Sequence, residues 1–209
     1  MRGCVLLGPP GAGKGTQATA LAERMGMVHL STGDLIREEI QTRSPLGIKV
    51  ESLVSRGELV GDGLVMALVA NRLEGKESKW ILFDGIPRTV GQAQTLEGIC
   101  HVDLVPLLVV PDEVVLERID GRREDPVTGQ IYHLVTNPPP DEIIDRLVQR
   151  KDDASLETVK ARLDVYRQET APVIDWYEQL GLLHPIDGTS SPSRITDALV
   201  VLLEERVCS

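Results

Sequence analysis

The stretch from Gly8 to Thr16 has the residue types and spacing of a loop that holds phosphate groups. Its glycines let the backbone turn so that several N–H groups point at one anion, and Lys14 can reach the terminal phosphates of a nucleotide. The apolar run Cys4 to Leu7 precedes the loop and a helix-forming run, Thr16 to Met25, follows it, which is the context that this motif requires. Gly15 stands where the general pattern has Ser or Thr, so the hydroxyl available to a magnesium ion or a phosphate moves to Thr16. The alternative is a glycine-rich turn without a ligand, but such a turn needs no lysine.

A second group of candidate residues follows the apolar run Trp80 to Phe83. Asp84 would end a buried strand beside the loop, where a carboxylate can hold magnesium through the ion's water shell. The alternative is that Asp84 only caps the next turn. Arg88, four residues further on, could clamp a second phosphate group through two hydrogen bonds.

Length and composition predict one compact unit. The chain has 209 residues, 42% of them hydrophobic and only 3% aromatic, so the core must consist of Leu, Val, Ile and Ala. A net charge of -10 argues against general binding to nucleic acid or to anionic membranes. We expect no membrane span and no signal segment, and therefore a cytoplasmic protein, or an organellar one if a transit peptide has been removed.

The three cysteines, Cys4, Cys100 and Cys208, lack the close spacing of a zinc site, and we expect them to stay reduced. Cys4 is expected in the core and Cys208 at the surface. A structural disulfide is the less favoured alternative, because the context is predicted to be intracellular.

Short apolar runs alternate with helical patterns, which predicts an α/β fold with a parallel sheet covered on both faces. The five predicted strands are Cys4 to Leu7, Met27 to Leu30, Trp80 to Phe83, Leu104 to Val109 and Leu183 to Ile186. The predicted helices are Lys14 to Met25, Ser31 to Gln41, Pro45 to Ser55, Asp62 to Leu73, Val90 to Ile99, Asp112 to Asp120, Ser155 to Leu180 and Pro192 to Glu205. Pro172 should kink the longest of them, because proline lacks the N–H and clashes with the preceding turn.

Two stretches do not fit this alternation. Residues 31–79 hold several helical segments, which is too much chain for one crossover. Residues 121–153 break into a turn, the extended run Gln130 to Val135 and a run of three prolines. Both should project from the carboxyl edge of the sheet, where ligands bind in open α/β folds.

Taken in order along nearly the whole chain, these motifs resemble those of nucleoside monophosphate kinases, specifically adenylate kinases of the long-lid type. The resemblance rests on the loop and on short motifs at residues 31–37, 56–60, 84–92, 118–123, 131–139, 150–153 and 162. It implies a P-loop NTPase three-layer fold with a core (1–30, 61–120 and 154–209), a monophosphate-binding insertion (31–60) and a lid (121–153). It also implies a monomeric enzyme that transfers a phosphoryl group from Mg-ATP to AMP, giving two ADP.

The resemblance also assigns roles to residues. It places ATP on Gly11, Ala12, Gly13, Lys14, Gly15, Thr16, Arg118, Arg122, Ile131 and Tyr132. It places AMP on Thr32, Arg37, Glu58, Leu59, Val60, Gly85, Ile86, Pro87, Arg88, Gln92, Arg150 and Arg162, with Gln92 reading the adenine edge. Asp84 would hold Mg²⁺ through water. The catalytic residues would be Lys14, Arg88, Arg122, Arg150 and Arg162, while Asp152 and Asp153 support the arginines and lid closure.

Physical chemistry agrees with this assignment independently. Phosphoryl transfer spreads negative charge over the equatorial oxygens, so catalysis consists mainly of alignment and stabilisation by cations. The AMP phosphate is already anionic at neutral pH, so the reaction needs no general base. A closing lid would exclude water, which would otherwise accept the phosphoryl group.

The predicted lid departs from its relatives. It has no cysteines, so we expect no zinc. Asp125 and Thr128 match the first half of a four-membered polar cluster, and the second half is missing. We expect hydrogen bonds and packing of Tyr132 on the proline run to hold it.

Other functions stay open at this point. A kinase could use GTP as donor or accept UMP or CMP. A nucleotide-dependent switch or ATPase would not need Arg37, Arg88 and Gln92, since it holds no second nucleotide. An inactive binding protein would not need the full set of cations.

Overall fold

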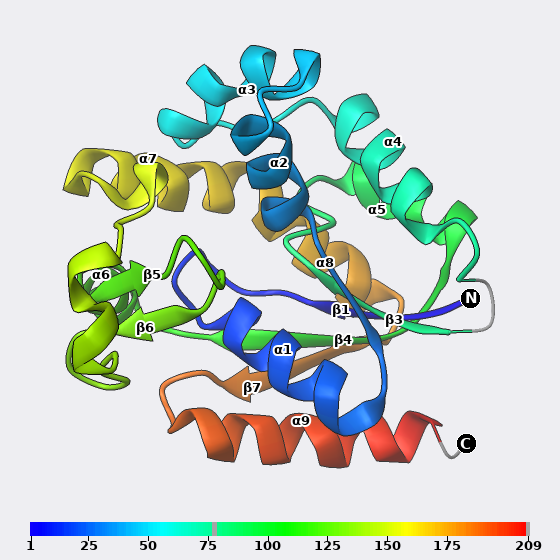
Figure 1. Ribbon diagram of the computed structural model, residues 1–209. Helices are drawn as coiled ribbons and strands as arrows, with labels where there is room; N and C mark the ends of the chain where they lie inside the picture. The colour runs from blue at the N-terminus through cyan, green and yellow to red at the C-terminus, as the bar shows by residue number, and fades with distance from the viewer. Residues whose placement is uncertain (77–78, 208–209) are drawn as a thin grey trace.

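The protein has a five-stranded parallel sheet at its centre, seen in the computed structural model, which describes residues 1–76 and 79–207 (Figure 1). The strand order is β2-β3-β1-β4-β7, and every neighbouring pair is parallel. The bounds are β1 Arg2–Leu6, β2 Val28–Ser31, β3 Trp80–Asp84, β4 His101–Val109 and β7 Leu183–Asp187. The α/β class and the five parallel strands predicted from the sequence are confirmed. The prediction for Cys208 lies outside the described residues.

Helices cover both faces of this sheet (Figure 1). One face packs against α4, α5 and α8, and the other against α1, α6, α7 and α9. The bounds are α1 Lys14–Met25, α2 Thr32–Gln41, α3 Pro45–Ser55, α4 Asp62–Leu73, α5 Val90–Ile99, α6 Asp112–Asp120, α7 Leu156–Val165, α8 Ala171–Gln179 and α9 Pro192–Val207. In the described part of the chain, no helix is both long enough and apolar enough to cross a membrane.

The two faces of the core follow from the two-residue period of a strand. Along β1, Cys4 and Leu6 join the cluster under α1 and α9, while Val5 belongs to the cluster under α4 and α5. All three side chains are essentially fully buried. A strand buried on both faces reads as a continuous apolar run, which is why the sequence indicated a parallel sheet.

Local signals fix where several helices begin. The hydroxyl of Ser31 accepts a hydrogen bond from the N–H of Asp34 at 3.2 Å, which caps α2. Side chains cap three further helices in the same way: Ser44 for α3, Thr89 for α5 and Ser155 for α7.

The long helix predicted from Ser155 to Leu180 is present as an unbroken helical run from Leu156 to Gln179, but it is not one regular α-helix. The structure divides it into α7, a π-helical turn at Tyr166–Thr170, and α8. Pro172 stands in the first turn of α8. Proline has no N–H to donate, and in a regular α-helix its ring would clash with a carbonyl of the preceding turn. The wider π-helical turn before Pro172 makes room for the ring and that carbonyl.

Residues 121–153 form a small unit beside the sheet. Its strands β5 (Arg122–Glu124) and β6 (Ile131–His133) pair antiparallel. The extended run predicted from Gln130 to Val135 is therefore shorter than expected. Two 3₁₀ turns follow, at Asp141–Arg146 and Lys151–Asp153. His133 and Asn137 exchange two backbone hydrogen bonds just before the proline run.

A buried carboxylate, that of Asp125, organises this unit. It accepts hydrogen bonds from the Thr128 hydroxyl at 2.9 Å, from the Val127 N–H at 3.1 Å, and from two nitrogens of Arg146 at 2.9 and 2.6 Å. Asp125 is 1% exposed, and its pKa is lowered to about 2, chiefly by the bond from Arg146. The polar cluster is thus completed by Arg146, which the sequence analysis did not identify. Tyr132 is buried, but its packing on the proline run stays a prediction.

We expect Arg146→Gln to loosen the 121–153 unit, because the buried carboxylate of Asp125 loses its cation. Amide hydrogen exchange at residues 122–133 should speed up on the order of tenfold, while the central sheet keeps its protection. Arg194→Gln, an exposed change on α9, is the matched control. Unchanged exchange in Arg146→Gln would show that this ion pair does not stabilise the unit.

Candidate functional site

The loop between β1 and α1 lies at the carboxyl end of the sheet and is shaped by its glycines. Gly11 and Gly13 have φ values of 79° and 95°, which residues with a side chain rarely adopt. A Cβ on Gly11 would also lie 2.8 Å from the Ile119 side chain. Gly13 is the residue that precedes α1, so the free N–H groups of that helix open toward the loop. The loop therefore forms an anion site from backbone donors and the helix dipole.

The ammonium group of Lys14 lies across this loop. It donates to the carbonyl oxygens of Gly8 at 2.8 Å and Pro9 at 2.9 Å. Its pKa is lowered to about 8, chiefly by burial. Asp84 opposes this shift, and Arg88, Arg162 and Arg122 add to it. A bound anion would offset the repulsion from these arginines and favour the charged lysine.

A cavity of about 1100 Å³ opens in front of the loop. All the cationic residues singled out in the sequence line it, although their elements are far apart in the chain: Lys14, Arg37, Arg88, Arg118, Arg122, Arg150 and Arg162. The remaining predicted site residues that line it are Gly11, Ala12, Gly13, Gly15, Thr16, Glu58, Leu59, Val60, Asp84, Gly85, Ile86, Pro87, Ile131 and Tyr132.

Thr32 and Gln92 are the two predicted site residues outside this lining. The Thr32 hydroxyl donates to the Gly85 carbonyl at 2.8 Å. The Gln92 side chain is 2% exposed, accepts from the Arg88 N–H and donates to Asp62, both at 2.8 Å. Both residues fix the loop that carries Arg88. Direct contact of either with a ligand stays a prediction.

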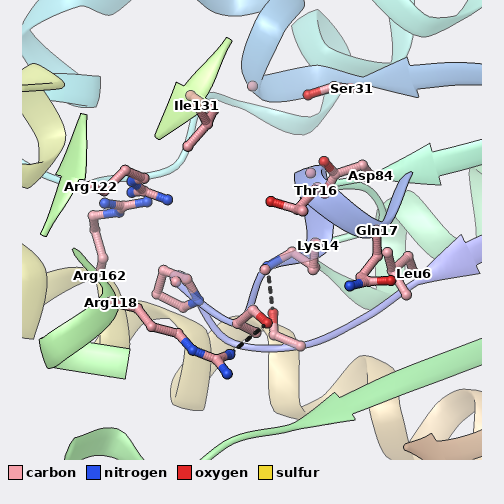
Figure 2. A pocket seen from close by; sticks show the side chains of 18 of the residues that line it. Leu6, Lys14, Thr16, Gln17, Ser31, Asp84, Arg118, Arg122, Ile131 and Arg162 are labelled. Atoms are coloured by element: carbon pink, nitrogen blue, oxygen red, sulfur yellow. Dashed lines mark hydrogen bonds between the residues drawn. The ribbon is translucent and has the colours of Figure 1, made fainter. Parts of the chain in front are cut away.

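Buried and partly buried carboxylates hold three of the arginines. Asp153 receives two hydrogen bonds from Arg122, at 2.8 and 2.7 Å, and one from Arg162 at 2.6 Å. Arg162 also pairs with Asp152 at 3.2 Å. The third, Arg150, donates through its Nε to Glu124. Figure 2 shows the Arg122 and Arg162 guanidinium groups side by side, across the cavity from Lys14.

The pKa values in this cluster show competition between burial and charge. Burial lowers the pKa of Arg122, although Asp153 opposes the change. Burial also lowers the pKa of Arg88, and the charge of Arg162 lowers it further. Burial alone would raise the pKa of Asp152, but the surrounding arginines outweigh it and lower that pKa. The cavity is therefore strongly electropositive within an acidic protein.

Arg118 has a different setting, because its guanidinium group bonds to two carbonyl oxygens. It donates to the carbonyl oxygen of Ala12 at 3.1 Å and to that of Gly188 at 2.8 Å. These bonds join the phosphate-binding loop to the segment after β7. Residues of that segment, Thr189 to Pro192, also line the cavity and were missed by the sequence analysis. Their position directly after a parallel strand was the signal that could have identified them.

The π-helical turn contributes further residues that sequence reasoning missed. Tyr166 and Thr170 both line the cavity. The Thr170 hydroxyl donates to the Arg88 carbonyl at 3.0 Å. The π-helical turn therefore supports the backbone of Arg88, which is predicted to bind phosphate. A π-helical turn cannot be read from residue types alone, since its cause is the fit between neighbouring elements.

Oxygen donors suited to magnesium lie near the loop. Asp84 ends β3 and is 9% exposed, and its Oδ2 is 3.7 Å from His29 Nε2. Figure 2 shows Thr16 and Asp84 beside each other. A hydroxyl and a carboxylate are hard donors that fit Mg²⁺ with water and phosphate as its other ligands. Within the described residues, no group of three or more His, Cys, Asp or Glu side chains could hold a metal ion by itself.

Comparisons with known proteins agree on one family. The family model described as adenylate kinase matches residues 6–182. The chain is similar to the curated adenylate kinase of Clostridium beijerinckii, with 42% identity over 95% of this chain and 97% of the relative. With the adenylate kinase of Kosmotoga olearia it shares 43% identity over 96% of this chain and 98% of the relative. With the adenylate kinase of Laccaria bicolor it shares 39% identity over 93% of this chain and 80% of the relative.

Binding of a nucleoside triphosphate should weaken as Lys14 loses its proton. Its pKa of about 8 means that the ammonium form is present at pH 7 and is largely lost at pH 9. Since phosphate groups ionise near pH 6, the ligand's charge stays constant over this range. The dissociation constant for ATP should rise about tenfold from pH 7 to pH 9. Calorimetric titration of the wild type and of Lys14→Met tests this, because the variant should show a flat profile between these pH values. An equally steep rise in both proteins would contradict the prediction.

Proposed function

The chain belongs to the adenylate kinase family, and on that premise we propose that it catalyses reversible phosphoryl transfer from Mg-ATP to AMP, giving two ADP. The observation that carries this proposal is the convergence of one lysine and six arginines on a single cavity. Phosphoryl transfer needs little covalent chemistry from a protein, but it needs cations around the transferred group.

We propose that the cavity has a donor end and an acceptor end. At the donor end, residues 11–16 supply backbone N–H groups and Lys14 for the ATP phosphates, and Arg118, Ile131 and Tyr132 bind the rest of ATP. At the acceptor end, Arg37 and Arg88 bind the AMP phosphate, together with residues 58–60 and 85–87. We also propose that Thr32 and Gln92 reach AMP, with Gln92 reading adenine. Their contacts with Gly85, Arg88 and Asp62 support this indirectly, because they hold the acceptor loop.

Arg122, Arg150 and Arg162 stand between the two ends. Their carboxylate partners hold them before any ligand arrives, so less entropy is lost when they meet the transferred group. Mg²⁺ would be held by the Thr16 hydroxyl and, through water, by Asp84, and when bound it neutralises phosphate charge. No residue is assigned as a general base, because the attacking phosphate oxygen of AMP is already ionised.

We propose three subdomains for this reaction: a core (1–30, 61–120 and 154–209), an acceptor-binding insertion (31–60) and a lid (121–153). The lid carries Arg122 and Arg150, so its closure would bring cations to the phosphates and exclude water together. We further propose a monomer that works in the cytoplasm and has no structural zinc. The free, buried thiols of Cys4 and Cys100 support a reducing environment.

The deciding experiment measures ADP formation by the purified protein with Mg-ATP, alone and with AMP, GMP, CMP or UMP. We expect a strong response to AMP only. Replacing ATP with GTP at fixed AMP tests the donor base. Activity with another acceptor would keep the mechanism and change the acceptor assignment. ATP hydrolysis without any response to acceptors would favour a nucleotide-dependent switch or ATPase.

Lys14→Ala should lower turnover on the order of a hundredfold or more, because it removes a cation from the transition state. Circular dichroism should show the same fold, since the side-chain bonds of Lys14 to the described residues go to loop carbonyl oxygens. Lys49→Ala, an exposed change on α3, is the control. A folded Lys14→Ala protein with near-normal turnover would refute this role.

A further inference from the structure

Glu124 lies behind one of the cavity arginines and does not line the cavity itself. Its carboxylate pairs with Arg150, and the two side chains are 20% and 17% exposed. An ion pair that is mostly withdrawn from water is screened less than a surface pair. Glu124 is therefore placed to act on Arg150 and not on a substrate.

The backbone on both sides of Glu124 fixes the position of this carboxylate. On one side, β5 pairs with β6, and Glu124 is opposite Ile131. On the other side, Glu124 and Val148 exchange two hydrogen bonds, each of 2.9 Å. Arg150 follows Val148 by two residues, so it lies diagonally across from Glu124, within reach of long side chains. A residue held on both sides has little freedom to move its side chain away.

The contact uses the inner nitrogen of the guanidinium group. Arg150 donates through Nε, and within the described residues no hydrogen bond involves its two terminal nitrogens. Those nitrogens belong to a side chain that lines the cavity. A phosphate group takes two parallel N–H donors from the edge of a guanidinium. The carboxylate thus holds Arg150 by the nitrogen nearest its stem and leaves the outer pair of nitrogens for an anion.

Charges of both signs lie near Arg150. The pKa of Arg122 is lowered by burial first, and the charges of Arg150 and Arg162 lower it further. Burial would also lower the pKa of Arg150, but the charge of Glu124 and its hydrogen bond, together with the charges of Asp152 and Asp153, outweigh burial and raise it. Without Glu124, repulsion would favour conformations of Arg150 that point away from the other arginines.

We propose that Glu124 is a positioning residue for phosphoryl transfer, which holds Arg150 by Nε so that its terminal nitrogens face the transferred phosphate. This inference rests on the proposed function, in which Arg150 contacts that phosphate. It adds a residue that touches neither nucleotide.

The test compares two variants of this side chain. Glu124→Leu removes both the charge and the hydrogen-bond acceptor at similar size, whereas Glu124→Gln keeps a carbonyl oxygen for the Nε–H. We expect Glu124→Leu to lower kcat ten- to a hundredfold, with KM for ATP and AMP changed less than about threefold. Glu124→Gln should recover most of the loss. The control is Glu142→Leu, which removes an exposed carboxylate from the same 121–153 unit and should leave kcat unchanged.

A double-mutant cycle with Arg150→Met separates positioning from general stability. If Glu124 acts through Arg150, Glu124→Leu lowers kcat no further in the Arg150→Met background. The same fold-loss in both backgrounds would overturn the inference. If Glu124→Leu does not fold at the assay temperature, Glu124→Gln carries the test: we expect a two- to fivefold loss that disappears in the Arg150→Met background.

Two outcomes distinguish failure of this inference from failure of the proposed function. If Arg150→Met is impaired and Glu124→Leu is not, the inference alone is wrong. If the wild type shows no transfer between ATP and AMP, or Arg150→Met turns over normally, the proposed role of Arg150 fails first and the inference fails with it.

Discussion

Mutual repulsion among the cavity cations is the constraint on which the rest of the structure depends. The chain is acidic overall, with a net charge of -10, yet it gathers a lysine and six arginines around one cavity. Such a cluster costs free energy unless anions lie close to it. The structure supplies such anions as carboxylates behind several of the arginines, with Asp153 fully buried between Arg122 and Arg162. Lys14, like Arg88 and Arg118, donates instead to carbonyl oxygens of the backbone.

This arrangement also explains why the cations come from so many elements. The loop and Asp84 follow strands of the parallel sheet, whose carboxyl ends meet at one edge. This edge by itself provides two of the cations: Lys14, from the loop after β1, and Arg88, from the loop after β3. The remaining arginines lie on α2, α6, α7 and the 121–153 unit, which surround that edge. A cavity with cations on several sides can enclose a charge that spreads over three equatorial oxygens, as phosphoryl transfer requires.

Much of the fold and site could be predicted from the sequence, because their signals are local. Strands buried on both faces give continuous apolar runs, caps such as Ser31 mark helix starts, and the glycine-rich loop has its own pattern. What the sequence could not give depends on contacts between distant segments. The π-helical turn at Tyr166–Thr170 and the cavity wall at Thr189–Pro192 are of this kind. The inward orientation of Gln92 likewise follows from Asp62, which is thirty residues away in the chain.

The consecutive acids Glu124 and Asp125 show how stability and chemistry are combined in the smallest part of the molecule. Asp125 pairs with Arg146, which does not line the cavity, and this pair closes the turn of the 121–153 unit. Glu124 pairs with Arg150, which does line it. Both arginines lie in the segment after β6, four residues apart. The Asp125–Arg146 pair therefore helps to fix the backbone from which Arg150 reaches Glu124 and the cavity. The two pairs share no side chain. A change at Asp125 should therefore act on the order of the whole unit, whereas a change at Glu124 should act on the direction of a single guanidinium group.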